Sequence, residues 1–165
     1  KNMGIPGVTI CFVKDNFLID TDNPKYLNLN LLTKSNSILN TPPTFSIYVL
    51  YLVTNWMLKM GGIDYFQNKS IKQSKEIYDF IDENSDVLSC SVDKKYRSKS
   101  NIVFNFLKDE HNKEFVDVAK NVGIIGINGH RSVGGIRVSL FNSVDEDMFE
   151  IFMKFFKKYI SELSN

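Results

Sequence analysis

The chain has 165 residues, of which 43% are hydrophobic and 13% aromatic, and it carries 20 basic and 19 acidic side chains. This length and apolar content fit one ordinary domain, or one lobe of a larger protein, with a substantial core. The net charge of +1 argues against a protein that binds nucleic acid or a membrane surface through bulk charge, so any anion must be held by locally placed groups.

The sequence predicts neither a secretory leader nor a membrane-spanning segment. The most apolar run, residues 45–58, has about 14 residues, whereas a spanning helix needs roughly 20. Cys11 and Cys90 lie in or beside apolar runs without a CxxC partner, which favours buried free thiols over a disulfide or a metal site. His111 and His130 also lack the spacing of metal ligands. We therefore expect a cytoplasmic protein without a bound metal.

The first predicted element is a strand at residues 8–13, a continuous apolar and β-branched run of the kind that is buried on both faces in α/β sheets. Residues 15–39 have no clear period and predict a loop with short helical or strand pieces. Because the chain starts at Lys1 rather than at a methionine, we also expect it to be a piece of a longer protein.

Two long helices are predicted next. Thr41 suits the N-cap and Pro42 the first position of a buried helix, which runs to residue 59 or 60 and stops at Gly61-Gly62. A second helical pattern follows and ends near Asn84. The core face of this second helix is predicted to contain Ile63, Phe66, Ile77, Tyr78 and Ile81.

The second half of the chain predicts a β-α-β-β-α unit. Strands are expected at residues 100–107, 124–127 and 136–140. The helix between the first two strands covers residues 110–121 and stops at Gly123. It is predicted to be buried through Phe115, Val118 and Ala119. The fold class is therefore α/β, with a small lobe that carries an antiparallel or mixed sheet.

A last helix is expected to start at Ser143, where Glu146 completes a capping box. Its apolar residues recur at helical spacing, so one face of it should pack on the sheet. That face is predicted to contain Val144, Met148, Ile151, Phe152, Phe155 and Tyr159.

Residues 129–137 form the most informative motif of the chain. Arg131 and Arg137 offer planar forks that bind carboxylate or phosphate through paired hydrogen bonds, and His130 adds another donor. The glycines of this segment allow a tight turn and a close approach to a ligand. Two separate anion-binding groups suit a dicarboxylate or a phospho-amino acid. The alternative is a solvated hairpin turn with ordinary surface arginines.

Two other positions are weaker candidates. Asn40 and Thr41 precede a predicted helix, whose first turn can bind a phosphate, although from these residues alone simple capping is the favoured explanation. Lys1 precedes a glycine-rich turn and a predicted strand. A partly buried lysine can act as a nucleophile toward a carbonyl, but most terminal lysines are solvated surface residues.

Four ordered segments together resemble the phosphoserine aminotransferase family. Their sequences are KNMGIPGVT, NTPPTF, RSKSNIVF and GHRSVGGIR, at residues 1–9, 40–45, 97–104 and 129–137. The resemblance runs from the first residue to at least Asn142. This chain differs from the usual family pattern at Ile5-Pro6 and at Ser100, neither of which is a ligand-binding residue type.

The resemblance implies the C-terminal part of a pyridoxal-phosphate enzyme with the aspartate-aminotransferase-like fold, fold type I. Residues 1–60 would be the tail of the large cofactor-binding domain with a linking helix, and residues 61–165 the small C-terminal domain. Lys1 would be the catalytic lysine, which binds pyridoxal 5'-phosphate covalently. Asn40 and Thr41 would reach the cofactor phosphate of the neighbouring subunit, so the active unit would be a homodimer.

The resemblance also implies a reaction, the transfer of an amino group between glutamate and 3-phosphohydroxypyruvate in serine biosynthesis. Arg137 would bind the substrate α-carboxylate. His130 and Arg131 would bind the far anion, which is the phosphate of phosphoserine or the side-chain carboxylate of glutamate. Lys1 would carry a proton to and from the substrate α-carbon. From the residues alone, a non-catalytic α/β anion-binding module or a structural domain stays open.

Overall fold

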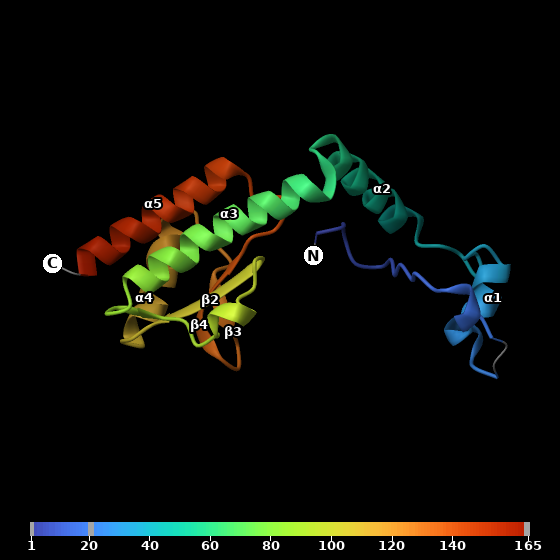
Figure 1. Cartoon of the computed structure of the whole chain (residues 1–165), viewed down its shortest axis with the longest axis horizontal. Coiled ribbons are helices and arrows are strands. Elements are labelled where there is room, and N and C mark those ends of the chain that lie inside the picture. The colour runs from blue at the N-terminus through green and yellow to red at the C-terminus, as the bar shows by residue number, and fades with distance from the viewer. Residues whose placement is uncertain (1, 20–21, 164–165) are drawn as a thin grey trace. The chain divides into compact units, whose positions relative to one another are not determined.

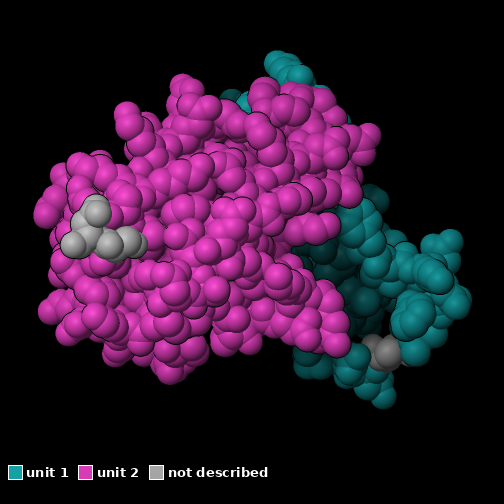
Figure 2. Space-filling view, turned by 60° about the vertical axis from the view of Figure 1, so that its left-hand side comes forward, with its two compact units in different colours: residues 1, 3–59 teal, residues 2, 60–165 magenta. Residues whose placement is uncertain are grey.

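A computed structural model describes residues 2–19 and 22–163 of the chain. Two compact units are distinguished, one formed by residues 3–59 and the other by Asn2 together with residues from Met60 onward (Figure 2). None of the helices in the described part of the chain is long and apolar enough to span a membrane. The domain roles expected for residues 1–60 and 61–165 stay predictions.

The first unit consists of short helical pieces followed by one long helix. Two 3-10 turns, η1 (Asp15–Phe17) and η2 (Lys25–Leu27), precede the short helix α1 (Leu29–Lys34). This confirms the prediction of a loop with short helical pieces at residues 15–39. The long helix is α2 (Thr44–Lys59), and its end before Gly61-Gly62 is as predicted.

The predicted buried strand at residues 8–13 is wrong for the structure described here. These residues have no strand conformation, and Cys11 is exposed rather than buried. Phe12 is 96% exposed. A strand exists only through hydrogen bonds to a neighbouring strand. Such a neighbour for this segment is not found among the described residues of its unit.

Helix α2 also differs from its prediction in its start and in its burial. It begins at Thr44, so Thr41 is not its N-cap and Pro42 is not its first residue. The reason is Pro43, whose ring disfavours helical dihedral angles in the residue before it. The carbonyl of Pro43 accepts the amide hydrogen of Ile47 at 3.1 Å. No residue of α2 is buried, whereas its apolar composition predicted a buried helix.

The second unit has the predicted β-α-β-β-α order, preceded by a long helix and one short strand. The long helix is α3 (Gly62–Glu83), which matches its prediction closely. The remaining elements are β1 (Leu88–Ser89), η3 (Lys94–Tyr96), β2 (Asn101–Phe106), α4 (Glu110–Asn121), β3 (Asn128–His130), β4 (Gly134–Ser139) and α5 (Glu146–Leu163). The strands form one antiparallel sheet in the order β1-β2-β4-β3 (Figure 1). The sequence analysis missed β1.

One face of this sheet forms the core together with the three helices. Burial alternates along β2, where Ile102, Phe104 and Phe106 are buried and their neighbours are not. Helices α3 and α5 run side by side (Figure 1), with the Phe80 and Phe156 rings 4.9 Å apart. The Phe156 ring also stacks on that of Phe104 at 5.0 Å. The core is therefore an aromatic layer between one sheet face and the helices.

Several residues predicted to face the core are exposed instead. Ile63 and Val118 are exposed, and Met148 and Ile151 of α5 are more than half exposed. Apolar residues cover more than one stripe of α5, so periodicity alone could not select the packed one. The sheet selects the stripe that contains Phe149, Phe152, Met153, Phe156, Tyr159 and Ile160.

The starts of two elements also shift from their predictions. Helix α5 begins at Glu146, and the Asp145 side chain accepts the amide hydrogen of Met148 at 2.8 Å, so Asp145 rather than Ser143 is the cap. The strand predicted at residues 124–127 lies later, as β3. Gly126 has a positive φ of 78°, which interrupts extended backbone before that strand.

An ion pair fastens α3 to the segment that enters β2. The Arg97 guanidinium donates two hydrogen bonds to Asp82, at 2.9 and 2.8 Å, and lies 4.7 Å from the centre of the Tyr78 ring. The Tyr78 hydroxyl donates to the carbonyl of Ser98 at 3.1 Å. Arg97, with Lys94, lowers the pKa of Asp82 from 3.8 to about 2. Burial raises the pKa of Tyr78 to about 12.

We predict that Asp82→Asn lowers the free energy of unfolding by about 1–2 kcal/mol at pH 7, because Arg97 loses its charged partner while its side chain is only 11% exposed. The folded-state pKa of Asp82 lies below its unfolded value. Its contribution is therefore complete above about pH 5 and is lost as the pH falls toward 2. Urea unfolding at pH 7 and at pH 2 measures both effects.

The matched control is Asp79→Asn on the same helix. Asp79 pairs with Lys75, but both side chains are at least half exposed. Water and salt screen such a pair, so this variant should unfold like the wild type. An equal loss of stability in the two variants would contradict a special role of the Asp82–Arg97 pair.

Candidate active site

The register of β2 and β4 places Arg137 on the sheet face opposite the core. Ile136 and Val138 are 1% and 6% exposed and point into the core. Arg137 lies between them, opposite Val103 of β2, and successive side chains of a strand point to opposite faces. The alternation that builds the core therefore directs this guanidinium to the open face of the sheet.

The hairpin of β3 and β4 requires glycine where the two strands meet. A Cβ atom on Gly129 would lie 1.7 Å from the carbonyl oxygen of Gly134. Gly135 has a positive φ of 71°, and a Cβ there would lie 2.2 Å from Oδ1 of Asn105. Gly129 therefore lets the backbones of β3 and β4 approach closely, and Gly135 leaves room for the Asn105 side chain of the neighbouring strand β2. They bring His130 and Arg131, at the turn, close to Arg137.

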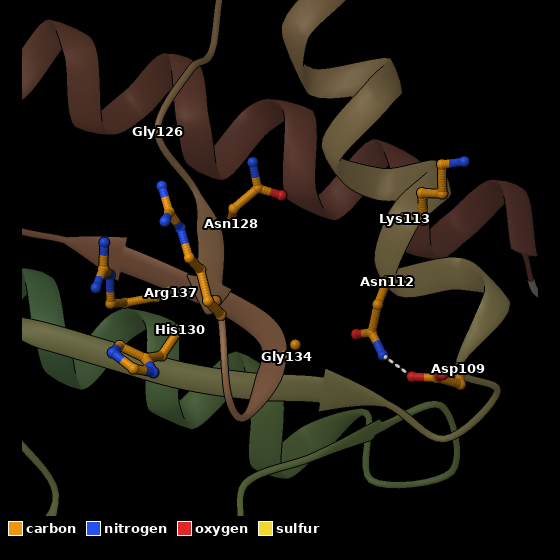
Figure 3. A pocket seen from close by; sticks show the side chains of 11 residues that line it. Asp109, Asn112, Lys113, Gly126, Asn128, His130, Gly134 and Arg137 are labelled. Carbon is orange, nitrogen blue, oxygen red and sulfur yellow. Dashed lines mark hydrogen bonds between the residues drawn. The ribbon is translucent and has the colours of Figure 1, made fainter.

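His130, Arg131 and Arg137 line one open cavity of about 790 Å³. This volume is in the range of small-molecule sites. The opposite wall comes from the start of α4, with Asp109, Asn112 and Lys113 (Figure 3). The structure thus brings together all the sequence-predicted cationic residues of the second unit.

A hydrogen-bond chain fixes the α4 wall of this cavity. Asn112 is buried, and its Oδ1 accepts the amide hydrogen of Phe106 at 3.0 Å. Its Nδ2 donates to Oδ1 of Asp109 at 2.9 Å (Figure 3). The end of β2 is thereby fastened to the first turn of α4. Asp109, the only carboxylate among the cavity's lining residues, accepts its hydrogen bond from Asn112.

The electrostatic character of the cavity is that of an anion site. Cationic side chains outnumber the Asp109 carboxylate along the lining. The Nε atom of Arg137 is buried and has no hydrogen-bond partner in the part of the chain that the structure describes. A buried unpaired donor is costly, which favours an acceptor supplied by a ligand. The arrangement can therefore hold a small molecule with more than one anionic group.

The structure does not assign the other predicted site residues to this cavity. Asn40 and Thr41 belong to the first unit, where both are exposed and precede the start of α2. Lys1 lies outside the described residues. Across the described ranges, no group of three or more His, Cys, Asp or Glu side chains could hold a metal ion.

The sequence analysis missed the α4 wall. Asp109 and Asn112 flank the start of a helix, where such residues ordinarily serve as caps, and Lys113 reads as part of a solvated helix face. These residues have no recognisable sequence motif, because they reach the cavity only through the fold. The end of β2 and the hairpin after β3 meet only when β2 pairs with β4. No spacing within the sequence reports that pairing.

The sequence of the chain matches a known protein family. The sequence model of the aminotransferase class-V family matches residues 1–152, which is most of the chain. The chain belongs to this family. The antiparallel sheet and its cationic cavity are therefore parts of an aminotransferase class-V fold.

Several relatives and solved structures that the chain matches are named phosphoserine aminotransferases. The probable phosphoserine aminotransferase of Dictyostelium discoideum is 37% identical over 163 residues, which is 96% of this chain and 44% of that protein. A solved structure described as radiation damage of the Schiff base in phosphoserine aminotransferase has a TM-score of 0.92 and 37% identity, covering 98% of this chain and 46% of its own.

A PLP-bound phosphoserine aminotransferase from Trichomonas vaginalis has a TM-score of 0.76 and 26% identity. That match covers 84% of this chain and 40% of the solved one. The chain thus spans less than half the length of each of these relatives.

We predict that Gly129→Ala opens the hairpin, because the added methyl group collides with the Gly134 carbonyl rather than with a flexible side chain. The expected loss of stability is about 1–3 kcal/mol. Amide exchange of Arg137, whose N–H donates to the Ile127 carbonyl at 2.8 Å, should accelerate relative to exchange in α5.

Gly123→Ala serves as the control for backbone strain alone. Gly123 has a positive φ of 85°, unlike Gly129, and a Cβ on Gly123 would meet nothing within 4 Å. This variant should leave the relative exchange rate of Arg137 unchanged. Similar acceleration in both variants would show that a general loss of stability, not the collision at Gly129, explains the effect.

Proposed function

We propose that the protein is a phosphoserine aminotransferase, which transfers an amino group between glutamate and 3-phosphohydroxypyruvate in serine biosynthesis. The observation that carries this proposal is the cavity where Arg137, with its unpaired buried Nε, lies near His130 and Arg131. The names of the relatives, at 37% identity over nearly the whole chain, support the same activity.

The two ends of the substrate would be bound by different residues. Arg137 extends from the rigid sheet, so it suits the α-carboxylate that all the amino-acid and keto-acid substrates share. His130 and Arg131 lie on the turn and suit the far anion, which is a phosphate in phosphoserine and a carboxylate in glutamate. A turn can adapt to two anions of different size more easily than a strand can.

The cofactor in this proposal is pyridoxal 5'-phosphate, which supplies the electron sink for the reaction. The described residues fit its phosphate group, because Asn40 offers amide donors and Thr41 a hydroxyl donor, both exposed just before α2. Lys1 would bind the cofactor through its amine and then move the proton at the substrate α-carbon. Among the solved relatives, one is described with a Schiff base and another as PLP-bound.

We also propose that the active unit is a homodimer in the cytoplasm, in which Asn40 and Thr41 serve the cofactor of the neighbouring subunit. The exposed apolar side chains that follow them on α2, including Phe45, Tyr48 and Tyr51, support an interface there. A contiguous exposed apolar surface is typical of contact with another protein surface.

The proposed function is tested by borohydride reduction of the intact protein, purified from the cells that produce it naturally. A visible absorbance band should disappear, and the peptide that contains Lys1 should gain the mass of the reduced cofactor. If no band exists but inorganic phosphate raises the melting temperature, and Arg137→Ala abolishes this effect, the protein is a non-catalytic anion-binding module instead.

We predict different substrate profiles for two arginine variants. Arg137→Ala should raise KM for phosphoserine and for alanine alike, because both carry an α-carboxylate. Arg131→Ala should raise KM about 10- to 150-fold for phosphoserine only, as expected for loss of about 1.5–3 kcal/mol from a charged hydrogen bond. Steady-state kinetics with both amino acids measures this difference.

Asn40→Ala provides the comparison for a neutral donor. It should raise KM for phosphoserine less than Arg131→Ala does, because a neutral hydrogen bond contributes only about 0.5–1.5 kcal/mol. Equal effects of the two substitutions would count against the role assigned to Arg131.

A further inference from the structure

The tight turn at residues 130–133 holds the His130 ring in a defined way. The turn is closed by the amide of Val133, which donates to the His130 carbonyl at 3.0 Å. Within it, Nδ1 of His130 lies 2.7 Å from the hydroxyl oxygen of Ser132 and 3.3 Å from the backbone nitrogen of Ser132. A single residue therefore approaches the same ring nitrogen with two polar groups.

These contacts are compatible with only one arrangement of ring protons. A backbone N–H can only donate, so Nδ1 must be the acceptor and must carry no proton. The Ser132 hydroxyl, which approaches the same lone pair, must then donate as well. A neutral imidazole with an unprotonated Nδ1 carries its proton on Nε2.

The second histidine of the chain has the opposite arrangement. Nδ1 of His111 lies 2.9 Å from Oε2 of Glu114, and a carboxylate can only accept. His111 therefore carries its proton on Nδ1. The hydrogen bond from His111 lowers the pKa of Glu114, which keeps that group an acceptor.

We propose that Ser132 is a positioning residue that holds His130 as the Nε2–H tautomer, so that His130 offers the far anion of the substrate a neutral N–H donor. This role rests on the proposed function for the identity of the ligand, but not for the tautomer itself. The positive charge at this end of the cavity then comes from Arg131, while His130 supplies direction.

A neutral, oriented donor has a physical advantage at this position. His130 and Arg131 are adjacent and both exposed, and two cations side by side would repel each other. A neutral imidazole avoids that repulsion and still donates to phosphate. It also cannot switch donor and acceptor atoms without losing the contact from the Ser132 backbone N–H and reversing the one from the Ser132 hydroxyl.

The experiment is long-range proton–nitrogen NMR of the intact protein labelled with ¹⁵N-histidine, at pH 7.5. The signals are assigned by their disappearance in the His111→Gln and His130→Gln variants. We expect His130 as the Nε2–H tautomer and His111 as the Nδ1–H tautomer in the same spectrum. Nδ1–H or doubly protonated His130 would overturn the proposal.

Variants of Ser132 test the cause of the tautomer. Ser132→Ala removes the shorter contact and leaves only the backbone N–H at 3.3 Å, so the Nδ1–H tautomer of His130 should become detectable beside the Nε2–H form. Ser132→Thr keeps both contacts and should retain the single tautomer. Ser139→Ala is the matched control, because Ser139 lies on β4, at the end away from the turn, and its hydroxyl donates to Oδ1 of Asn101 on β2 at 3.2 Å. An unchanged His130 signal in Ser132→Ala would overturn the role of Ser132.

Titration with inorganic phosphate separates this proposal from the proposed function. Phosphate should shift the Nε2 signal of His130 and leave His111 unaffected, and Ser132→Ala should bind phosphate about two- to tenfold more weakly. If the tautomers are as expected but phosphate produces no shift, the anion site fails while the positioning role of Ser132 stands. If phosphate binds but His130 is the Nδ1–H tautomer, the anion site stands while the positioning role of Ser132 fails.

Discussion

The antiparallel pairing of β2 with β4 is the constraint on which the rest of the second unit depends. It aligns Phe104 with Ile136 and Val103 with Arg137. The first of these pairs lies in the core and the second on the opposite face of the sheet. Because side chains alternate strictly along a strand, a slip of one residue would bury the guanidinium and expose the core. The apolar core thus fixes the direction of the anion-binding group.

The platform beneath the cavity is rigid for identifiable reasons. Aromatic rings from the sheet and helices pack at centroid distances near 5 Å, as for Phe104 on Phe156. The Asp82–Arg97 pair fastens α3 to the entry of β2, and Asn112 fastens the end of β2 to α4. Both ends of the central strand are therefore held by polar contacts. A binding group is most effective when such a second layer fixes its geometry.

The sequence predicted the second unit well and the first unit poorly, and the difference is one of burial. Helices α3 and α4 follow from periodicity and from the glycines that end them, and Ile102, Phe104 and Phe106 follow from alternation. Residues 8–13 and α2 carry equally strong apolar patterns but contain no buried residue. An apolar pattern indicates that a segment packs against other apolar residues, but it does not identify those residues.

At the site, too, residues close together in the sequence were predictable as a group, whereas residues from a distant segment were not. The grouping of His130, Arg131 and Arg137 was predictable because all three lie on one hairpin, within reach of one another whatever the rest of the chain does. The α4 wall, with Asp109 and Lys113, was not predictable. Those residues reach the cavity only through strand pairing that joins distant parts of the sequence.

By itself, the sequence determined the β-α-β-β-α order of the second half of the chain, the residue types at the anion site and the resemblance to the aminotransferases. Only the tertiary structure decided which stripe of α5 is buried, which face Arg137 occupies and which nitrogen of His130 carries the proton. The physical reason is that propensity and spacing act over a few residues. Packing, register and hydrogen-bond partners are instead set by contacts between residues far apart in the chain, or by the exact conformation of a turn.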